Sequence, residues 1–275
     1  MLNEDKNVQE CDATEDQQRY AAGYLKISNF PLPKILFMKQ LLIVLCAFTL
    51  LVSCQRRFGK RVEGNGNLRS ETRDISPTSK IKVLGSIDVE LIPGDFGVKV
   101  EADENLLKYI ITDKEDGWLV IRQKNRVNLK TNNPLKVYVS TNDVKAIDVS
   151  GSGDVSGVGK FNGGSRLRID ISGSGDVALN VNTPKVKVDI AGSGTASLSG
   201  ETKDADVEIA GSGNYRAENL MTESTSIDII GSGDARVFAD VNLSAKVIGS
   251  GSVLYKGKAD VRSKITGSGS VRPID

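Results

Sequence analysis

The second half of the chain alternates apolar and polar residues with a period of two, and this alternation recurs around one tripeptide. Four residues and two residues before each copy of Gly-Ser-Gly stand mostly β-branched apolar residues, with a mostly charged residue between them, as in Ile147-Asp148-Val149. Such alternation predicts a strand with one buried face. Successive copies are 22, 19, 19, 20, 18 and 18 residues apart and begin at Gly151, Gly173, Gly192, Gly211, Gly231, Gly249 and Gly267.

A second strand is predicted directly after each tripeptide, where another column of mostly apolar residues begins. Its members are Val155, Val177, Ala196, Tyr215, Ala235, Val253 and Val271. Each unit of about 20 residues therefore holds two short strands and has no room for a helix. A unit this small cannot bury its own apolar face, so it must stack on its neighbours.

Two arrangements of these units are plausible. The units could form hairpins in a sandwich or barrel, or each unit could be one turn of a β-helix whose strands pair in parallel with those of the next turn. Like residues recur in columns across the units, which parallel in-register stacking predicts and antiparallel hairpins do not. We therefore predict an all-β fold, a β-helix (β-solenoid) over residues 147–275, with coils of about 20 residues and Gly-Ser-Gly corners.

The Gly-Ser-Gly column has two functional interpretations and one structural one. A phosphate-binding loop needs a helix after it, whereas here a strand follows. A calcium-binding β-roll would use Asp154, Asp176 and Asp234, which follow the tripeptide. The same position holds Thr195, Asn214, Ser252 and Ser270 in other units, and the period is about twice too long. We therefore interpret the tripeptide as a corner at which glycine tolerates positive φ and lets adjacent coils approach.

One column of charged residues is a candidate ligand or cation face. It consists of Asp148, Asp170, Asp189, Glu208 and Asp228. Carboxylates stacked about 5 Å apart repel one another, and Arg168 and Lys187, two residues earlier on the same face, can offset part of this repulsion. Two interpretations stay open: a face that binds a cation or a basic partner, and a solvated polar surface.

The same column changes sign near the C-terminus, where it continues as Lys246 and Lys264. Arg262, Arg272 and Pro273 lie around the last predicted strand. An open end of a β-helix is a template for further strand pairing, and basic residues and proline protect such edges. We predict that the C-terminal coil is a free end protected in this way.

Composition narrows the chemistry. The 275-residue chain has 39% apolar and 26% charged residues and a net charge of +1, so no overall basic field points to nucleic acid. It contains no histidine, which removes the Ser-His-Asp arrangement and the commonest metal ligand. The three cysteines, Cys11, Cys46 and Cys54, all precede the repeats. We predict no catalytic residues, no metal site and no cofactor.

The front of the chain resembles a bacterial lipoprotein signal. Residues 38–53 contain Lys39, an apolar run from Leu41 to Val52 and a small residue before Cys54, which is too short for a membrane span and typical of a secretory signal peptide. Leu51-Val52-Ser53-Cys54 resembles the lipobox, which implies lipidation of Cys54 and an anchor linker over residues 54–60. Residues 1–37 are then an upstream extension, either non-native or disordered. The membrane is the implied partner.

Five segments before the repeats carry a more specific resemblance. They are VEGNGN (62–67), IKVLGSIDVELIPGD (81–95), VKVEADENLLKYI (98–110), WLVIRQK (118–124) and PLKVYVSTNDVKAIDVSGSGDV (134–155). In this order, and leading into the repeats, they resemble the auto-transporter adhesin family with the head GIN domain. Residues 61–146 are then the N-terminal β-rich part of that domain. The resemblance implies a β-helical fold and a cell-envelope location, and it brings no catalytic residues.

Together these observations predict a lipoprotein of the outer membrane or cell surface whose β-helix acts as a non-enzymatic adhesin or binding module for a glycan or a surface protein. Two other classes stay open. One is an enzyme acting on envelope glycans, which would need paired carboxylates with separated pKa values and aromatic platforms for sugar rings. Trp118 is the only tryptophan. The other is a structural envelope protein without a discrete ligand.

Overall fold

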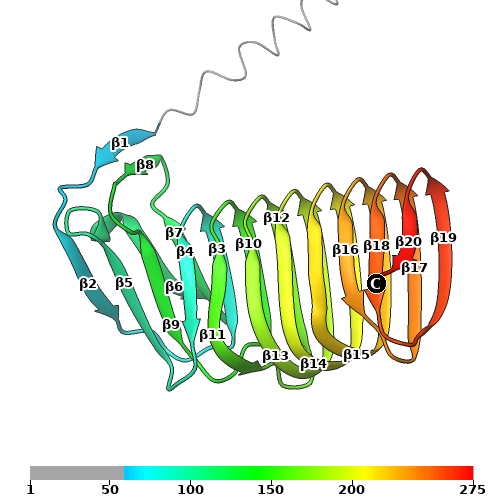
Figure 1. Cartoon of the computed structure of the whole chain (residues 1–275). Helices are drawn as coiled ribbons and strands as arrows, with labels where there is room; N and C mark the ends of the chain where they lie inside the picture. Colours follow the sequence, from blue (N-terminus) through cyan, green and yellow to red (C-terminus); the bar gives the residue numbers. More distant parts are fainter. Residues whose placement is uncertain (1–58, 275) are drawn as a thin grey trace, which may run out of the picture. The chain divides into compact units, whose positions relative to one another are not determined.

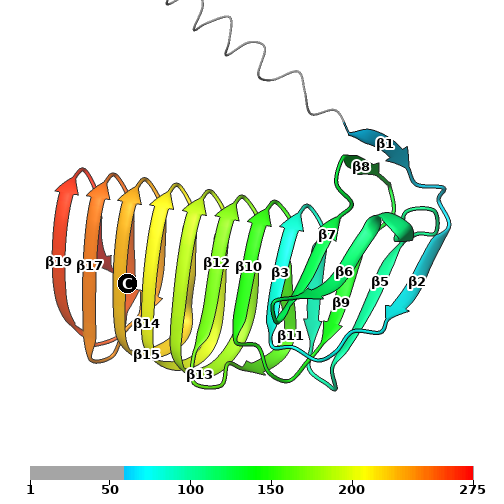
Figure 2. The same ribbon diagram turned by 180° about the vertical axis from the view of Figure 1, so that it is seen from behind.

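The structure of the protein is a computed structural model that describes residues 59–274. This part of the chain is a β-solenoid of about seven turns spaced about 19 residues apart, which confirms the predicted β-helix. The coils stack side by side along one axis (Figures 1 and 2). Residues 1–37, the predicted signal peptide and Cys54 lie outside the described residues.

The repeats form two facing sheets. The first sheet holds the strands that run into each Gly-Ser-Gly corner, and the second sheet holds the strands that leave it (Figure 1). Three long strands continue from the second sheet round the opposite, lower corner into the first. The repeat strands are β10 (Ala146–Gly151), β11 (Val155–Asn162), β12 (Leu167–Gly173), β13 (Val177–Gly192), β14 (Thr195–Gly211), β15 (Asn214–Gly231), β16 (Asp234–Phe238), β17 (Asn242–Gly249), β18 (Ser252–Lys256), β19 (Asp260–Gly267) and β20 (Ser270–Pro273).

Pairing between successive coils is parallel and in register. In the first sheet Asp148 lies beside Asp170 and Gly151 beside Gly173, and the pattern repeats from coil to coil. In the second sheet Val155 lies beside Val177 in the same way. This register excludes the hairpin arrangement for the repeats and places like residues in columns.

The inward columns form the core between the two sheets. In the first sheet the column two residues before each corner is exposed by 2% or less from Val149 to Val247. The β-branched residues that dominate this column suit a pleated surface that is buried on one face. In the second sheet the fully buried Tyr215 lies between Ala196 and Ala235, so a large side chain is accommodated by small ones in the coils on either side.

The corner glycines are required by close approach of the backbones. Gly192 has φ +128°, and a Cβ at this position would lie 2.3 Å from the carbonyl oxygen of Gly173 in the preceding coil. The same carbonyl accepts a hydrogen bond of 2.8 Å from the N–H of Ser193. Positive φ and the lack of space for a side chain both demand glycine. The corner interpretation of the tripeptide therefore accounts for this geometry.

The lower corner carries a column of buried threonines that the sequence reasoning missed. Thr183, Thr202 and Thr222 lie in register and are nearly fully buried. The hydroxyls of Thr183 and Thr202 donate to the carbonyl oxygens of Lys185 and Asp204, two residues further on, at 3.5 and 3.3 Å. Such local bonds satisfy a buried hydroxyl and shape the turn.

The stack begins before the first Gly-Ser-Gly. β3 and β4 form a coil that pairs in parallel with β10 and β11, and its corner reads Gly85-Ser86-Ile87. β7 and β9 form the layer beyond it. Outside that layer β6, β5 and β2 run antiparallel. The strands of this part are β1 (Lys60–Glu63), β2 (Leu68–Arg73), β3 (Lys80–Gly85), β4 (Asp88–Ile92), β5 (Gly97–Asp103), β6 (Ile110–Glu115), β7 (Trp118–Gln123), β8 (Val127–Lys130) and β9 (Lys136–Ser140), with the 3-10 helix η2 (Leu107–Tyr109).

Candidate functional site

The five predicted carboxylates lie side by side on the outer face of the first sheet. We call them the carboxylate row, and they come from β10, β12, β13, β14 and β15. Side-chain exposure increases along the row, from 21% at Asp148 to 27% at Asp189 and 61% at Glu208. Asp228 is also exposed. The row thus has a partly covered half near the N-terminus and an open half further on.

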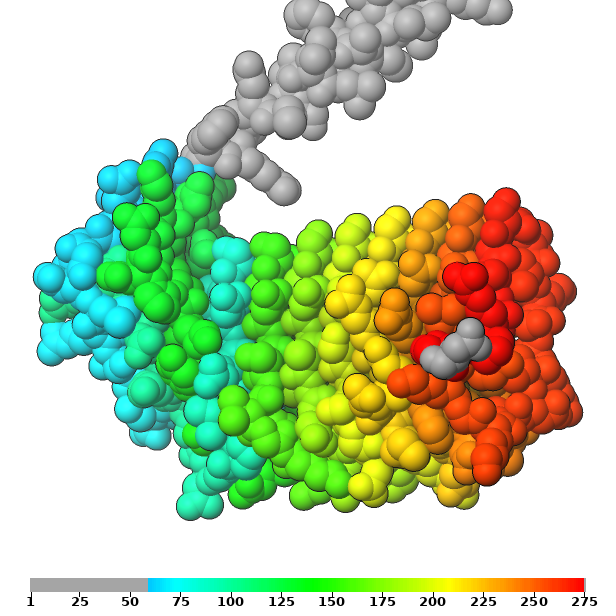
Figure 3. Space-filling model, viewed as in Figure 1, coloured from blue at the N-terminus to red at the C-terminus, as the bar shows by residue number. Residues whose placement is uncertain are grey.

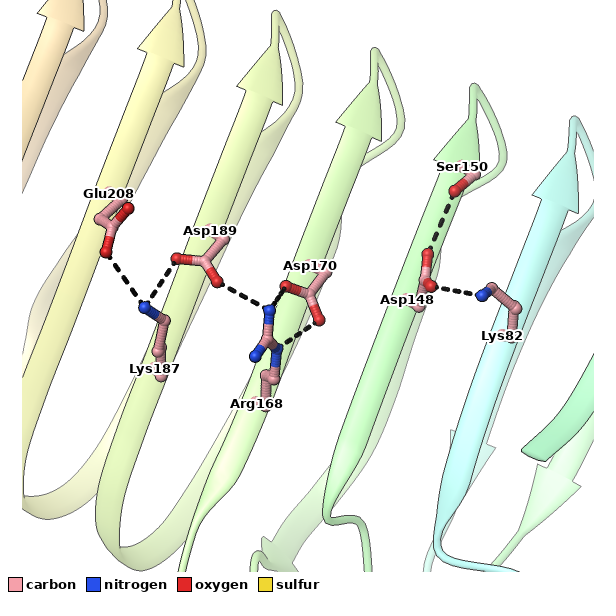
Figure 4. A network of polar contacts seen from close by, with 8 residues as sticks. All are labelled: Lys82, Asp148, Ser150, Arg168, Asp170, Lys187, Asp189 and Glu208. Atoms are coloured by element: carbon pink, nitrogen blue, oxygen red, sulfur yellow. Dashed lines mark hydrogen bonds and ion pairs between the residues drawn. The ribbon is translucent and has the colours of Figure 1, made fainter. Parts of the chain in front are cut away.

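Basic residues cover the first half of the row with ion pairs (Figure 4). Lys82 Nζ on β3 lies 2.8 Å from Asp148 Oδ2. The Arg168 guanidinium binds both oxygens of Asp170 at 2.7 and 2.8 Å and reaches Asp189 in the next coil at 3.1 Å. These contacts confirm that Arg168 offsets the repulsion between stacked carboxylates.

Lys187 links the covered half to the open half of the row. Its Nζ lies 3.4 Å from Asp189 Oδ1 and 3.1 Å from Glu208 Oε1. Burial raises the pKa of the Asp189 carboxyl, Lys187 opposes this, and the Asp170 carboxylate adds to it. Because the pKa is raised in the folded state, ionised Asp189 costs stability at neutral pH, and the cost decreases as the pH falls through that pKa.

The open half of the row adjoins a second outward column, which becomes more apolar along the stack. We call this column the apolar row, and it consists of Ser150, Ser172, Ala191, Ala210, Ile230 and Ile248. Ile230 is 58% exposed and Ile248 is 39% exposed. Between the rows lies a shallow depression of about 280 Å³, lined among others by Asp189, Glu208 and Asp228. Here carboxylates and exposed apolar side chains share one surface.

The aspartates after the corners have a structural use. Asp154 Oδ1 accepts the backbone N–H of Asp176 at 2.9 Å, and Asp176 Oδ1 accepts that of Thr195 at 2.7 Å. Asp234 does the same for Ser252. Each carboxylate thus ties its coil to the next. Among residues 59–274 there is no group of three or more His, Cys, Asp or Glu side chains placed to hold a metal ion.

The sugar-stacking platform that a glycan-active site needs is not offered by Trp118. Its ring lies on β7 beneath Lys80 and Lys82, whose Nζ atoms are 5.8 and 5.6 Å from the ring centroid. A hollow of about 380 Å³ on the second sheet is lined by polar side chains that include Asn180, Ser197 and Arg216. The sequence does not reveal this hollow, because its outward columns change residue type from coil to coil, as in Ala178, Ser197 and Arg216.

No helix within the described part of the chain has the length and apolar character needed to span a membrane. The predicted lipidation residue Cys54 precedes that part, so the structure does not place it.

These residues build a two-sheet parallel β-solenoid that carries rows of like side chains on its flat outer faces. The family described as "Putative auto-transporter adhesin, head GIN domain" matches residues 78–259, more than half of the chain. The chain belongs to this family, as the sequence resemblance indicated.

Solved structures share the fold. A putative adhesin from Bacteroides fragilis is 20% identical with a TM-score of 0.72, and the match covers 78% of this chain and 100% of that one. A putative adhesin and a putative lipid binding protein, both from Parabacteroides distasonis, are 28% and 27% identical, each with a TM-score of 0.64 and the same coverage. A search of curated proteins found no match.

Proposed function

We propose that this protein is a lipoprotein of the outer membrane or cell surface, anchored through Cys54, whose solenoid binds a partner without catalysis. The binding face is the open half of the carboxylate row together with the apolar row beside it. Membership of the adhesin family and the names of the solved relatives support a binding module.

The observation that carries this proposal is that exposed carboxylates lie next to exposed apolar side chains. Glu208 and Asp228 project from successive coils beside Ile230 and Ile248. Asp228 forms no ion pair with any described residue. A partner that offers basic and apolar side chains would neutralise the carboxylates and cover the isoleucines.

A protein partner fits this face better than a glycan. Sugar rings are commonly bound by stacking on aromatic side chains, and neither row contains an aromatic residue. The ring of Trp118 lies beneath two lysines. We therefore propose a surface protein with a basic and apolar patch as the partner class.

Charge reversal on the open half tests the proposal. Bacteria carrying the full chain would be applied to immobilised fibronectin, laminin and collagen and to a glycan array. We expect adhesion to at least one protein, and a loss of at least about tenfold in Glu208→Lys/Asp228→Lys. Glu223→Lys/Asp240→Lys makes the same change of charge near the lower corner and should adhere like the unmodified chain.

Other outcomes would contradict the proposal in distinguishable ways. If Glu208→Lys/Asp228→Lys adhered like the unmodified chain, the binding face would lie elsewhere on the protein. Release of a product from the glycan array would indicate an enzyme, and binding to no surface would favour a structural envelope protein.

A further inference from the structure

A basic groove lies at the N-terminal end of the stack, outside the site described above. It is formed where the first Gly-Ser corners face the loop between β7 and β8, and its volume is about 570 Å³. We call it the corner groove. Its polar lining includes the hydroxyls of successive corners and the side chains of the loop, and it contains no carboxylate: Ser86, Ser152, Ser174, Gln123, Lys124 and Arg126.

The loop that carries the basic residues is a tight turn in an unusual conformation. The N–H of Val127 donates to the carbonyl oxygen of Lys124 at 3.3 Å, and Arg126, in the third position of this turn, has φ +61°. Glycine or asparagine is usual at such a position, because other side chains are strained there. Lys124 and Arg126 are exposed, and neither forms an ion pair within residues 59–274. Their charges are therefore not used in an ion pair within this part of the chain.

The same loop is tied to the point where the chain enters the solenoid. The N–H of Lys60 donates to the carbonyl oxygen of Arg126 at 2.7 Å, and β1 continues this contact by pairing with β8. A Cβ on Gly59 would lie 2.5 Å from the carbonyl carbon of Arg126, so the two segments are closely packed. Figure 1 shows β1 and β8 side by side at this end of the stack.

This contact limits how far the groove can be from the predicted anchor. Gly59 follows Cys54 by five residues, which span at most about 17 Å when fully extended. Lys60 and Lys130 add exposed positive charge on β1 and β8, whereas Arg61 is paired with Glu63 at 3.3 Å. A lipid on Cys54 would therefore hold this basic surface close to the headgroups, where attraction to an anionic membrane is strong.

We propose that the corner groove binds the phosphate groups of anionic lipids in the leaflet that holds the anchor. The inference rests on the proposed anchoring through Cys54. The Arg126 guanidinium suits a phosphate because it can donate two parallel hydrogen bonds, while Lys124 adds a point charge and the serine hydroxyls add further donors. The groove would thus fix the orientation of the solenoid on the membrane, with its C-terminal end directed away.

Hydrogen exchange on the membrane-bound full chain tests this inference. The protein would be reconstituted in vesicles of phosphatidylcholine alone or with 30% phosphatidylglycerol. We expect the amides of residues 124–130 to exchange at least about fivefold more slowly on the anionic vesicles. This difference should disappear in Lys124→Gln/Arg126→Gln. It should persist in Lys258→Gln/Arg262→Gln, which removes the same charge at the far end of the stack.

The outcomes separate the groove from the anchor. Equal exchange on both vesicles, or loss of the difference in Lys258→Gln/Arg262→Gln, would overturn the role of the groove. If the protein does not float with phosphatidylcholine vesicles in a density gradient, the proposed anchor is refuted. Flotation with the anionic vesicles then tests the groove by itself. In that case the unmodified chain and Lys258→Gln/Arg262→Gln should float, and flotation of Lys124→Gln/Arg126→Gln to the same extent would refute the groove.

Discussion

The two ends of the solenoid are finished in different ways. At the N-terminal end β5 and β6 reverse direction and pair antiparallel with β9 and β7, and the segment between them buries Leu106 and Leu107. At the C-terminal end β19 and β20 (Figure 1) pair on one side only in the described structure. Ile265 is 41% exposed there, whereas Val247 in the same column is fully buried.

The two ends show two ways in which a repeating stack can stop. Each parallel coil offers the next an equivalent edge, so stacking contains no stop of its own. The N-terminal end changes strand direction and covers the core. The C-terminal end keeps the parallel edge and places Lys264, Arg272 and Pro273 on it. The space-filling view shows the closely packed coils between these two ends (Figure 3).

Substituting a corner glycine with alanine should lower the free energy of unfolding more than any other change considered. The loss should depend on where the glycine lies in the stack. Gly85 in the first Gly-Ser corner has φ +101° with nothing within 4 Å of a Cβ, whereas at Gly192 a Cβ meets Gly173. We expect Gly85→Ala to cost about 1 kcal/mol from backbone strain alone, and Gly192→Ala at least about 3 kcal/mol. Denaturant unfolding measures both, and equal costs would show that contact between coils does not set the glycine requirement.

Removing the charges and the proline from the open end should promote association. In Lys264→Val/Arg272→Val/Pro273→Val the last strands become an apolar pairing edge next to the exposed Ile265. Light scattering should then report larger species than for the unmodified protein. Lys246→Val/Arg236→Val makes similar changes on strands that are paired on both sides, and it should scatter like the unmodified protein. An unchanged mass of the triple variant would mean that these residues do not protect the end.

The centre of the stack differs from both ends in that it buries a tyrosine side chain, Tyr215, completely. The Tyr215 hydroxyl has no hydrogen-bond partner in the described structure, and burial raises the pKa of Tyr215. We expect Tyr215→Phe to be about 1 kcal/mol more stable, since an unsatisfied buried hydroxyl is removed.

The same variant should also change the response to alkali. A raised pKa in the folded state means that the stability from the neutral phenol is complete below about pH 10 and is lost as the pH rises further, by about 1.4 kcal/mol per pH unit. Tyr215→Phe should lack this part of the alkaline loss. A less stable variant would show that the hydroxyl has a partner, and an unchanged pH profile would show that the pKa of Tyr215 is not raised.

The smallest predicted change in the free energy of unfolding comes from removing single cations beside the carboxylate row, and it should differ between the two halves of the row. Arg168→Gln removes contacts to Asp170 and Asp189, but the pairs are partly exposed, so we expect a loss of only about 0.5–1 kcal/mol. Lys246→Gln, beyond the open half, should change stability by less than about 0.5 kcal/mol. The loss in Arg168→Gln should shrink in 1 M salt. A salt-independent loss would indicate packing rather than charge.

The repeats could be predicted from the sequence because each structural requirement recurs as a column. Alternation marked the strands, and the tripeptide marked the corners. The coil of β3 and β4 was missed because Ile87 replaces the second glycine of the tripeptide, and because residues 93–145 separate this coil from the next in sequence. The threonine column at the lower corner was also missed, since threonine occurs in many contexts.

The carboxylate row could be predicted as a set of residues but not as two halves. Its division depends on where the cations lie and on how exposed each carboxylate is. Lys82, Arg168 and Lys187 pair with the less exposed carboxylates, and Lys187 also reaches the exposed Glu208. Asp206 and Ser226 occupy the positions equivalent to Lys187 in the following coils, so they offer no cation to Asp228. That distinction needs side-chain reach as well as register.

We propose that the N-terminal end of the solenoid lies at the membrane, because the chain enters the solenoid there shortly after Cys54. Metabolic labelling of the full chain with a radioactive fatty acid tests this most directly. We predict label on the unmodified protein and on Cys46→Ser, and none on Cys54→Ser. Label retained on Cys54→Ser would contradict the account.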